Sequence, residues 1–188
     1  MELNYPMDLE QLGAGFRLRK VAAGDEDALH EFALGLPPHD LLYLRRDISK
    51  RPVVDAWVRD SLSGEIETLI VEKDGKIIAN AALIIDTKSW SRHVGEIRVL
   101  VAKDHRKSGI GRLLIEQTFA IAISRELRKI IAQMTIDQKN AIKVFEEMGF
   151  SGEALLKDHV QDTTGEFHDI LILSCSVNAV TARMAMSR

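Results

Sequence analysis

The order of polar and apolar residues along the chain predicts a series of strands and helices. Runs in which apolar residues alternate with polar ones, or follow one another unbroken, predict seven strands, at residues 15–21, two within 67–86, 94–102, 128–136 and two within 153–177. Runs with helical spacing predict four helices, at residues 24–36, 51–62, about 109–127 and 138–150. Asp74-Gly75 and Thr163-Thr164-Gly165 are turn sequences, so each predicts a hairpin between the strands around it.

The order of these elements predicts an α/β fold with a mixed, mostly antiparallel central sheet of about six or seven strands, flanked by about four helices. Strands 94–102 and 128–136 enclose a helix, so we expect them to run parallel through a right-handed crossover. We expect a single domain over residues 1–188, with 1–14 as an N-terminal extension and 177–188 as a tail, both peripheral.

Composition and charge narrow the possible partners. The chain has 188 residues, of which 46% are hydrophobic and 28% charged, as in ordinary globular proteins. Its formal net charge of −3 gives no electrostatic basis for binding nucleic acid or an anionic membrane. The N-terminus lacks the pattern of a signal peptide, and the apolar runs are too short to span a bilayer. Because the one cysteine, Cys175, cannot form an internal disulfide, we expect a cytoplasmic protein.

Two glycines, Gly109 and Gly111, stand where a strand leads into a helix, and this position predicts an anion site. Such a turn points several main-chain N–H groups at one place, at the positive end of the helix dipole. The alternative is a tight turn in which the glycines only permit close packing. The spacing does not match a P-loop, and a dinucleotide fingerprint would need glycine where Leu114 stands.

The segment RKSGIG, residues 106–111, resembles the R/Q-x-x-G-x-G/A signature of the GCN5-related N-acetyltransferase (GNAT) superfamily. A second block, from Asn140 to Gly149-Phe150, is similar to the Asn…Gly-Phe segment of that family, in the matching order and at the matching separation. The resemblance covers about residues 15–175 and implies that the parallel strands splay apart to admit acetyl-CoA. It assigns cofactor binding to Val99, Leu100, Val101, Arg106, Lys107, Ser108, Gly109, Ile110, Gly111, Arg112, Asn140 and Phe145.

The resemblance also implies the reaction, which is transfer of an acetyl group from acetyl-CoA to a primary amine by direct attack in a ternary complex. The acceptor is a small-molecule or protein amine, with no nucleic acid or membrane partner, and a homodimer is possible. Arg45 and Arg46 are candidates to meet a substrate carboxylate, with a solvated surface pair as the alternative. Trp57 and Trp90 are candidates for the acceptor side, with ordinary packing as the alternative for Trp57.

Glu96 is the first candidate for the general base, because its Glu-Ile context resembles that of a catalytic glutamate in the histone-acetylating branch of the family. A carboxylate on a largely apolar strand beside a cleft can take a proton from an amine, directly or through a water molecule. The alternatives are a solvent-facing residue or a partner for nearby Arg98. His93 is a second candidate, because histidine titrates near working pH, but it is expected in a loop.

Two positions complicate this assignment. Phe145 stands where the family most often has a tyrosine that protonates the leaving thiolate, and phenylalanine has no proton to donate. The alternative function is therefore an acetyl-CoA-binding sensor or regulatory module with little turnover. By the resemblance, Asn140 is expected to contact the cofactor or the main chain near it, with an N-cap of helix 138–148 as an alternative that is compatible with this contact.

A metal site is not expected. Polar residues of the last hairpin, His159, Asp162, His168 and Asp169, fit no zinc spacing, and alternating polar residues are normal on a half-solvated hairpin.

Overall fold

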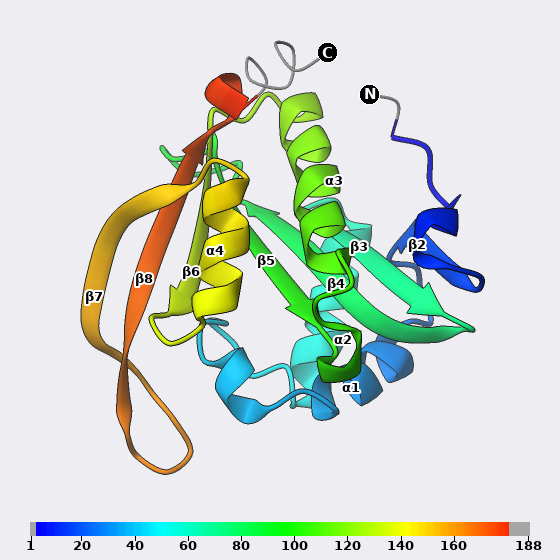
Figure 1. The fold of residues 1–188 in the computed structure, drawn as a ribbon, viewed down its shortest axis with the longest axis horizontal. Helices are drawn as coiled ribbons and strands as arrows, with labels where there is room; N and C mark the ends of the chain where they lie inside the picture. The colour runs from blue at the N-terminus through cyan, green and yellow to red at the C-terminus, as the bar shows by residue number, and fades with distance from the viewer. Residues whose placement is uncertain (1–2, 181–188) are drawn as a thin grey trace.

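One sheet of eight strands organises the chain in the computed structural model, which describes residues 3–180 (Figure 1). The strand order is β1-β2-β3-β4-β5-β6-β8-β7. The strands are β1 (Met7–Asp8), β2 (Phe16–Lys20), β3 (Ile66–Lys73), β4 (Lys76–Ile85), β5 (Val94–Val101), β6 (Lys129–Thr135), β7 (Ser151–Gln161) and β8 (Phe167–Ser176). The helices are α1 (Glu26–Leu34), α2 (Arg51–Leu62), α3 (Ile110–Ser124) and α4 (Lys139–Glu147), with short 3-10 turns η1 (Glu10–Leu12), η2 (Pro38–Leu41) and η3 (Lys103–His105).

β5 and β6 form the parallel pair, and they pair over only part of their length. The pairing runs from Val94 opposite Lys129 to Ile97 opposite Ala132. Beyond that point β5 continues beside β4 as far as Val101, and β6 continues beside β8 as far as Thr135. Residues 98–101 of β5 therefore have a strand on one side only, and we call this side the open edge of β5. The mixed sheet with a splayed parallel pair is confirmed.

Helices cover both faces of the sheet and create two apolar cores. α3 and α4 lie over one face, and α1 and α2 over the other (Figure 1). Successive side chains of β3 point to opposite faces of the sheet and enter different cores. Leu69 belongs to the core that contains Phe119 of α3, and Ile70 belongs to the core that contains Val54 and Val58 of α2. Burying each such side chain contributes about 1.5–3 kcal/mol, so the sheet is held between the two helical layers.

The two ends of the chain contribute more to the fold than predicted. The N-terminal segment adds an eighth strand, β1, and its Leu9 is fully buried in the same core as α3. The Tyr5 hydroxyl donates to Gln117 Oε1 of α3 at 2.9 Å. Val177 and Val180 are also buried in this core, and residues 181–188 of the predicted tail lie outside the described residues. The described parts of these ends are therefore packed rather than peripheral, because apolar side chains anchor them.

Among residues 3–180, no helix combines the length and the apolar character needed to cross a bilayer.

Candidate functional site

The main-chain groups of the open edge alternate in direction. Ala102 N–H donates to Ile78 O at 2.8 Å, so even-numbered positions of this strand turn their main-chain groups toward β4. Odd-numbered positions turn theirs away from β4. Val99 and Val101 therefore present N–H and C=O groups to the side that β6 has left, where an extended ligand can pair with them as a strand does.

Two side chains reach these main-chain oxygens. The Tyr43 hydroxyl, from the loop between η2 and α2, donates to Val99 O at 2.9 Å. Arg106 Nε donates to Val101 O at 3.1 Å, and the same guanidinium forms an ion pair with Asp40. Each carbonyl keeps a second lone pair, so these contacts leave an acceptor position for a ligand.

The Tyr43 hydroxyl is buried and lies near charges of both signs. Burial raises the pKa of its hydroxyl above the usual range for tyrosine. Among the nearby charges, Arg98 and Arg106 lower this pKa and Asp40 and Glu96 raise it, and burial outweighs them. The hydroxyl therefore keeps its proton throughout the physiological range, as a hydrogen-bond donor at the open edge.

The start of α3 has the properties of an anion site. Gly109 is its N-cap in the left-handed conformation, with φ +88°, and no side chain caps it among the described residues. Ser108 instead donates to His105 O at 2.6 Å. The N–H groups of Ile110, Gly111 and Arg112 thus lack intrahelical partners, whereas Leu113 N–H already donates to Gly109 O at 3.0 Å. The helix dipole favours negative charge at these free N–H groups.

Space for a ligand is available at the same place. A Cβ at Gly109 would meet no other atom within 4 Å, and one at Gly111 would come to 3.9 Å from Val101 Cγ2. The Ile110 side chain is buried in the core, so this residue can offer a ligand only its main chain. The uncapped amides and the open space fit a diphosphate group, and the turn leads directly back to the open edge of β5.

Two of the remaining predicted cofactor residues belong to α4. Asn140 is exposed as the second residue of α4, and the N-cap is Gln138, so the capping role proposed for Asn140 is wrong. Phe145 is buried in the core and packs edge-to-face on Phe150, with ring centroids 4.9 Å apart.

A cavity of about 460 Å³ opens on the opposite face of the sheet, beneath α2 and the loop before it. Its floor is formed by alternate residues of two paired strands. Glu96, Arg98 and Leu100 of β5 lie opposite Ile84, Ala82 and Asn80 of β4, respectively. The small Ala82 leaves room for the Arg98 side chain. The volume is in the range of small-molecule sites.

Glu96 lies in this floor, and only 8% of its surface is exposed. Its Oε1 accepts a hydrogen bond from Arg98 Nε at 2.8 Å, and Arg45 Nη2 lies 3.6 Å from Oε2. Of the three sequence interpretations, the solvent-facing one is wrong. Glu96 both pairs with Arg98 and lines the cavity, because residues two apart on a strand have their side chains on the same face.

The other candidates fall on different sides of the cavity. His93 is exposed in the turn before β5 and does not line the cavity. Trp57 lines it, with the indole held by a hydrogen bond from Nε1 to Thr68 Oγ1 at 3.0 Å. Trp90 is 96% exposed, in the loop that joins β4 to β5.

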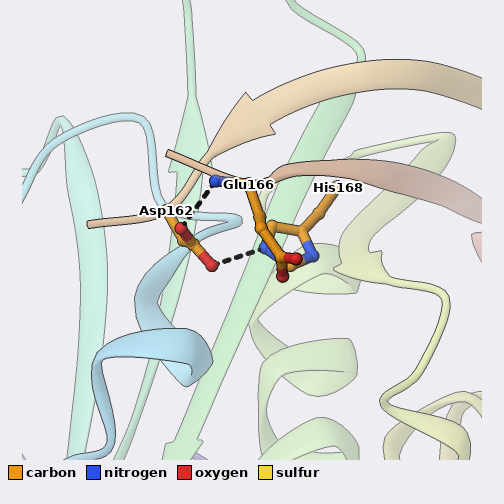
Figure 2. A group of neighbouring side chains, drawn as sticks. All are labelled: Asp162, Glu166 and His168. Atoms are coloured by element: carbon orange, nitrogen blue, oxygen red, sulfur yellow. Dashed lines mark hydrogen bonds and ion pairs between the residues drawn. The ribbon is translucent and has the colours of Figure 1, made fainter. Parts of the chain in front are cut away.

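A separate group of side chains gathers at the tip of the β7–β8 hairpin (Figure 2). Asp162, Glu166 and His168 place ligand-type atoms within 4.8 Å of one another. Both carboxylate oxygens of Asp162 already have partners. Oδ2 pairs with His168 Nε2 at 2.8 Å, and Oδ1 accepts hydrogen bonds from the N–H groups of Thr164 and Glu166. The hydrogen bond from His168 holds the pKa of Asp162 well below its usual range. These contacts fix the turn, and His159 and Asp169 lie outside the group.

Three residues of the site carried no signal in the sequence. Tyr43 stands in the segment DLLYLRRD, which has no motif, and only the chain path brings it to Val99. Asn80 lies within an apolar strand, where its direction follows from the register with β5. The sequence indicates Arg98 only as a partner of Glu96.

Comparisons with known proteins agree with this geometry. The model of the acetyltransferase (GNAT) family matches residues 36–150, well over half of the chain. Comparison with curated protein sequences gives no match.

Similar solved structures include an N-acetyltransferase from Staphylococcus aureus Mu50, with a TM-score of 0.75 and 14% identity, covering 87% of this chain and 99% of that one. A putative acetyltransferase of Salmonella typhimurium, solved with its cofactor acetyl-CoA, gives 0.72 and 18%, covering 87% and 94%. Spermidine N-acetyltransferase from Vibrio cholerae, in complex with CoA and spermine, gives 0.72 and 18%, covering 90% and 99%. At these identities the likeness shows the fold, and the match of the family model shows the membership. The chain belongs to the GNAT family of acetyltransferases.

Proposed function

We propose that the protein transfers an acetyl group from acetyl-CoA to a primary amine, within a ternary complex of both substrates. One structural relationship supports this proposal most strongly. The open edge of β5 joins the uncapped start of α3 at one end to a cavity with a buried carboxylate at the other.

The first part of the proposal concerns acetyl-CoA. The main chain from Lys107 to Arg112 holds the diphosphate, because its amides are uncapped and Gly109 leaves open space. Val99 and Val101 pair with the extended arm of the cofactor through their outward main-chain groups. Bound in this way, acetyl-CoA supplies an activated acetyl group at the cavity side of the edge.

The second part concerns proton transfer. Glu96 accepts a proton from the amine, directly or through a water molecule, because it is the buried carboxylate of the cavity floor. Val99 follows Glu96 by three positions, roughly 10 Å along an extended strand. This distance leaves room for an amine between the carboxylate and the open edge.

Tyr43 supplies the hydroxyl donor for the leaving thiolate, which Phe145 has no hydroxyl group to supply. Phe145 is buried among aromatic side chains, whereas the Tyr43 hydroxyl is a protonated donor at the open edge. A leaving thiolate develops negative charge, and a donor hydroxyl nearby stabilises it. We therefore assign the donor role to Tyr43, from the loop before α2.

Phe145 also supports a second candidate, a module that binds acetyl-CoA with little turnover. The two candidates share the cofactor site and differ in catalysis.

One experiment separates these candidates. Thermal-shift measurements with acetyl-CoA, ATP and NAD test the cofactor, and release of the CoA thiol with a panel of primary amines tests turnover. Stabilisation by acetyl-CoA alone together with amine-dependent thiol release supports the transferase. Stabilisation without release on any amine supports the binding module, and stabilisation by ATP or NAD but not by acetyl-CoA contradicts both.

A further inference from the structure

Basic and acidic side chains are equally numerous around the cavity. A site that binds a polycation is expected to have an excess of acidic ones. Its lining includes four basic side chains, Arg45, Arg46, Lys88 and Arg98. It also includes four acidic ones, Asp60, Glu65, Asp86 and Glu96. A polyamine carries several positive charges and needs an excess of carboxylates, so this lining suits a ligand that carries charges of both signs.

At the floor of the cavity, positively charged groups outnumber negatively charged ones. Two guanidinium groups, of Arg98 and Arg45, face the single carboxylate of Glu96, at 2.8 Å and 3.6 Å. Within residues 3–180, Arg98 uses only Nε in this contact, so its two terminal nitrogens stay available. A planar guanidinium binds a carboxylate through two parallel hydrogen bonds, which makes arginine the preferred residue for this task.

Asn80 adds an unsatisfied polar group at the same floor. The residue is 2% exposed and lines the cavity, and its Oδ1 has no hydrogen-bond partner in the part of the chain described. A buried oxygen without a partner costs about 1–3 kcal/mol, so such an atom is usually satisfied by something that binds there. Because Oδ1 only accepts hydrogen bonds, the group that satisfies it is a donor, such as an amine N–H.

The remaining wall is apolar. Trp57, Ile66 and Leu100 line it, and the hydrogen bond from Trp57 to Thr68 fixes the indole. The cavity therefore offers guanidinium groups, hydrogen-bond acceptors and an apolar surface within about 460 Å³.

We propose that the acetyl acceptor is a small primary amine that also carries a carboxylate, and that Arg45 and Arg98 hold this carboxylate while the amine faces Glu96 and Asn80. The inference rests on the acetyl transfer proposed for this site, and it names the class of acceptor.

The test uses pairs of amines that differ only in the carboxylate: leucine with isoamylamine, phenylalanine with phenethylamine, and methionine with 3-methylthiopropylamine, with spermidine as the polycation. Binding to the CoA-loaded protein is measured by calorimetry, and acetylation by thiol release. We expect at least one amino acid to exceed its decarboxylated partner in kcat/KM by about tenfold or more.

The variant Arg45→Gln should reduce that preference, because it should raise KM for the amino acid more than KM for the decarboxylated amine. Arg45 is mostly exposed, so this variant is expected to fold. Arg59→Gln is the matched control, because Arg59 is an exposed arginine of α2 outside the cavity lining. It should behave as the unaltered protein.

Several results would overturn the inference. Preference for spermidine or for the decarboxylated amines, or an equal effect of Arg45→Gln on both members of a pair, rejects the carboxylate. If acetyl-CoA binds but no amino acid is bound or acetylated, the acceptor class is wrong while the cofactor site stands. If acetyl-CoA itself fails to bind, the proposed function fails as well.

Discussion

Tyr43 donates its hydroxyl hydrogen to the main-chain oxygen of Val99 at 2.9 Å, and thereby joins the loop before α2 to the open edge of β5. The contact links the two halves of the site, because acceptor-side charges and those of the Arg106 turn both act on this hydroxyl.

Replacing Tyr43→Phe should lower kcat by about 10²-fold, in the range of general acid catalysis, with little change in the Kd for acetyl-CoA. The reason is that only the hydroxyl is removed from the open edge. Steady-state kinetics and calorimetry measure the two quantities. Tyr5→Phe is the control, because the other tyrosine bonds to Gln117 on α3, and an unchanged kcat in Tyr43→Phe would remove the assigned role.

Replacing Phe145→Tyr should not raise activity, although it restores the residue typical of the family. The new hydroxyl would enter an aromatic core and lose about 1–3 kcal/mol of stability, because it finds no partner there. Chemical denaturation and kcat test both statements. Phe167→Tyr, on an exposed side chain, should leave stability unchanged, and a faster Phe145→Tyr enzyme would place the general acid on α4 after all.

Neither tyrosine should titrate near its ordinary pKa of about 10 in the folded protein. Burial, with a contribution from Glu67, raises the pKa of Tyr5 to about 12, and burial raises that of Tyr43 further. Because their pKa values are raised in the folded state, the contribution of the two tyrosines to stability should be constant below about pH 10, the unfolded value, and should be lost as the pH rises above it.

Tyrosinate absorbance of the folded protein should therefore stay low until the chain unfolds in alkali, whereas the chain in denaturant should titrate near pH 10. Measuring the same curve for Tyr43→Phe assigns the signal. A midpoint near 10 in folded protein, lost in that variant, would mean that Tyr43 is not buried.

Replacing Glu96→Gln should lower kcat by about 10²-fold or more, because the amide retains the shape of the side chain but does not accept the proton. The loss should shrink as the pH rises and more of the amine is already neutral. His93→Gln is the matched variant on the second candidate and should retain activity, since His93 is exposed outside the cavity. The reverse pattern would transfer the role of base to His93.

Most of the fold was predictable because its signals are local. The helix at 51–62 and the hairpins at Asp74-Gly75 and Thr163-Thr164-Gly165 appear as predicted. Helical spacing and turn residues determine such elements within a few positions of the chain. By contrast, β1 has only two residues, too few to form a pattern, and it exists because β2 offers a free edge.

The cofactor side of the site was predictable for the same reason, and the acceptor side was not. Gly109 and its neighbours are contiguous in the sequence, so the motif alone predicts the conformation of the turn that they form. The acceptor side instead depends on Asn80 and Arg98, which line the cavity, and on Tyr43 at the open edge. These three residues come from distant segments, and their positions follow from strand register and from the path of one loop. The motif does not determine where α4 begins, because the N-cap is Gln138 and not Asn140.

The central claim is that the start of α3 holds the diphosphate of acetyl-CoA, and the most direct test is the Kd for acetyl-CoA of Gly109→Leu. Gly75→Leu is its matched control, because Gly75 also has a positive φ and open space around a Cβ, at the distant β3–β4 turn. Both variants carry similar backbone strain, on the order of 1–2 kcal/mol.

Circular dichroism first establishes that both variants are folded, and calorimetry then gives the two values of Kd. We predict that Gly109→Leu binds acetyl-CoA at least about tenfold more weakly than the unaltered protein, whereas Gly75→Leu binds it equally well. A folded Gly109→Leu variant with unchanged affinity for acetyl-CoA would contradict the account.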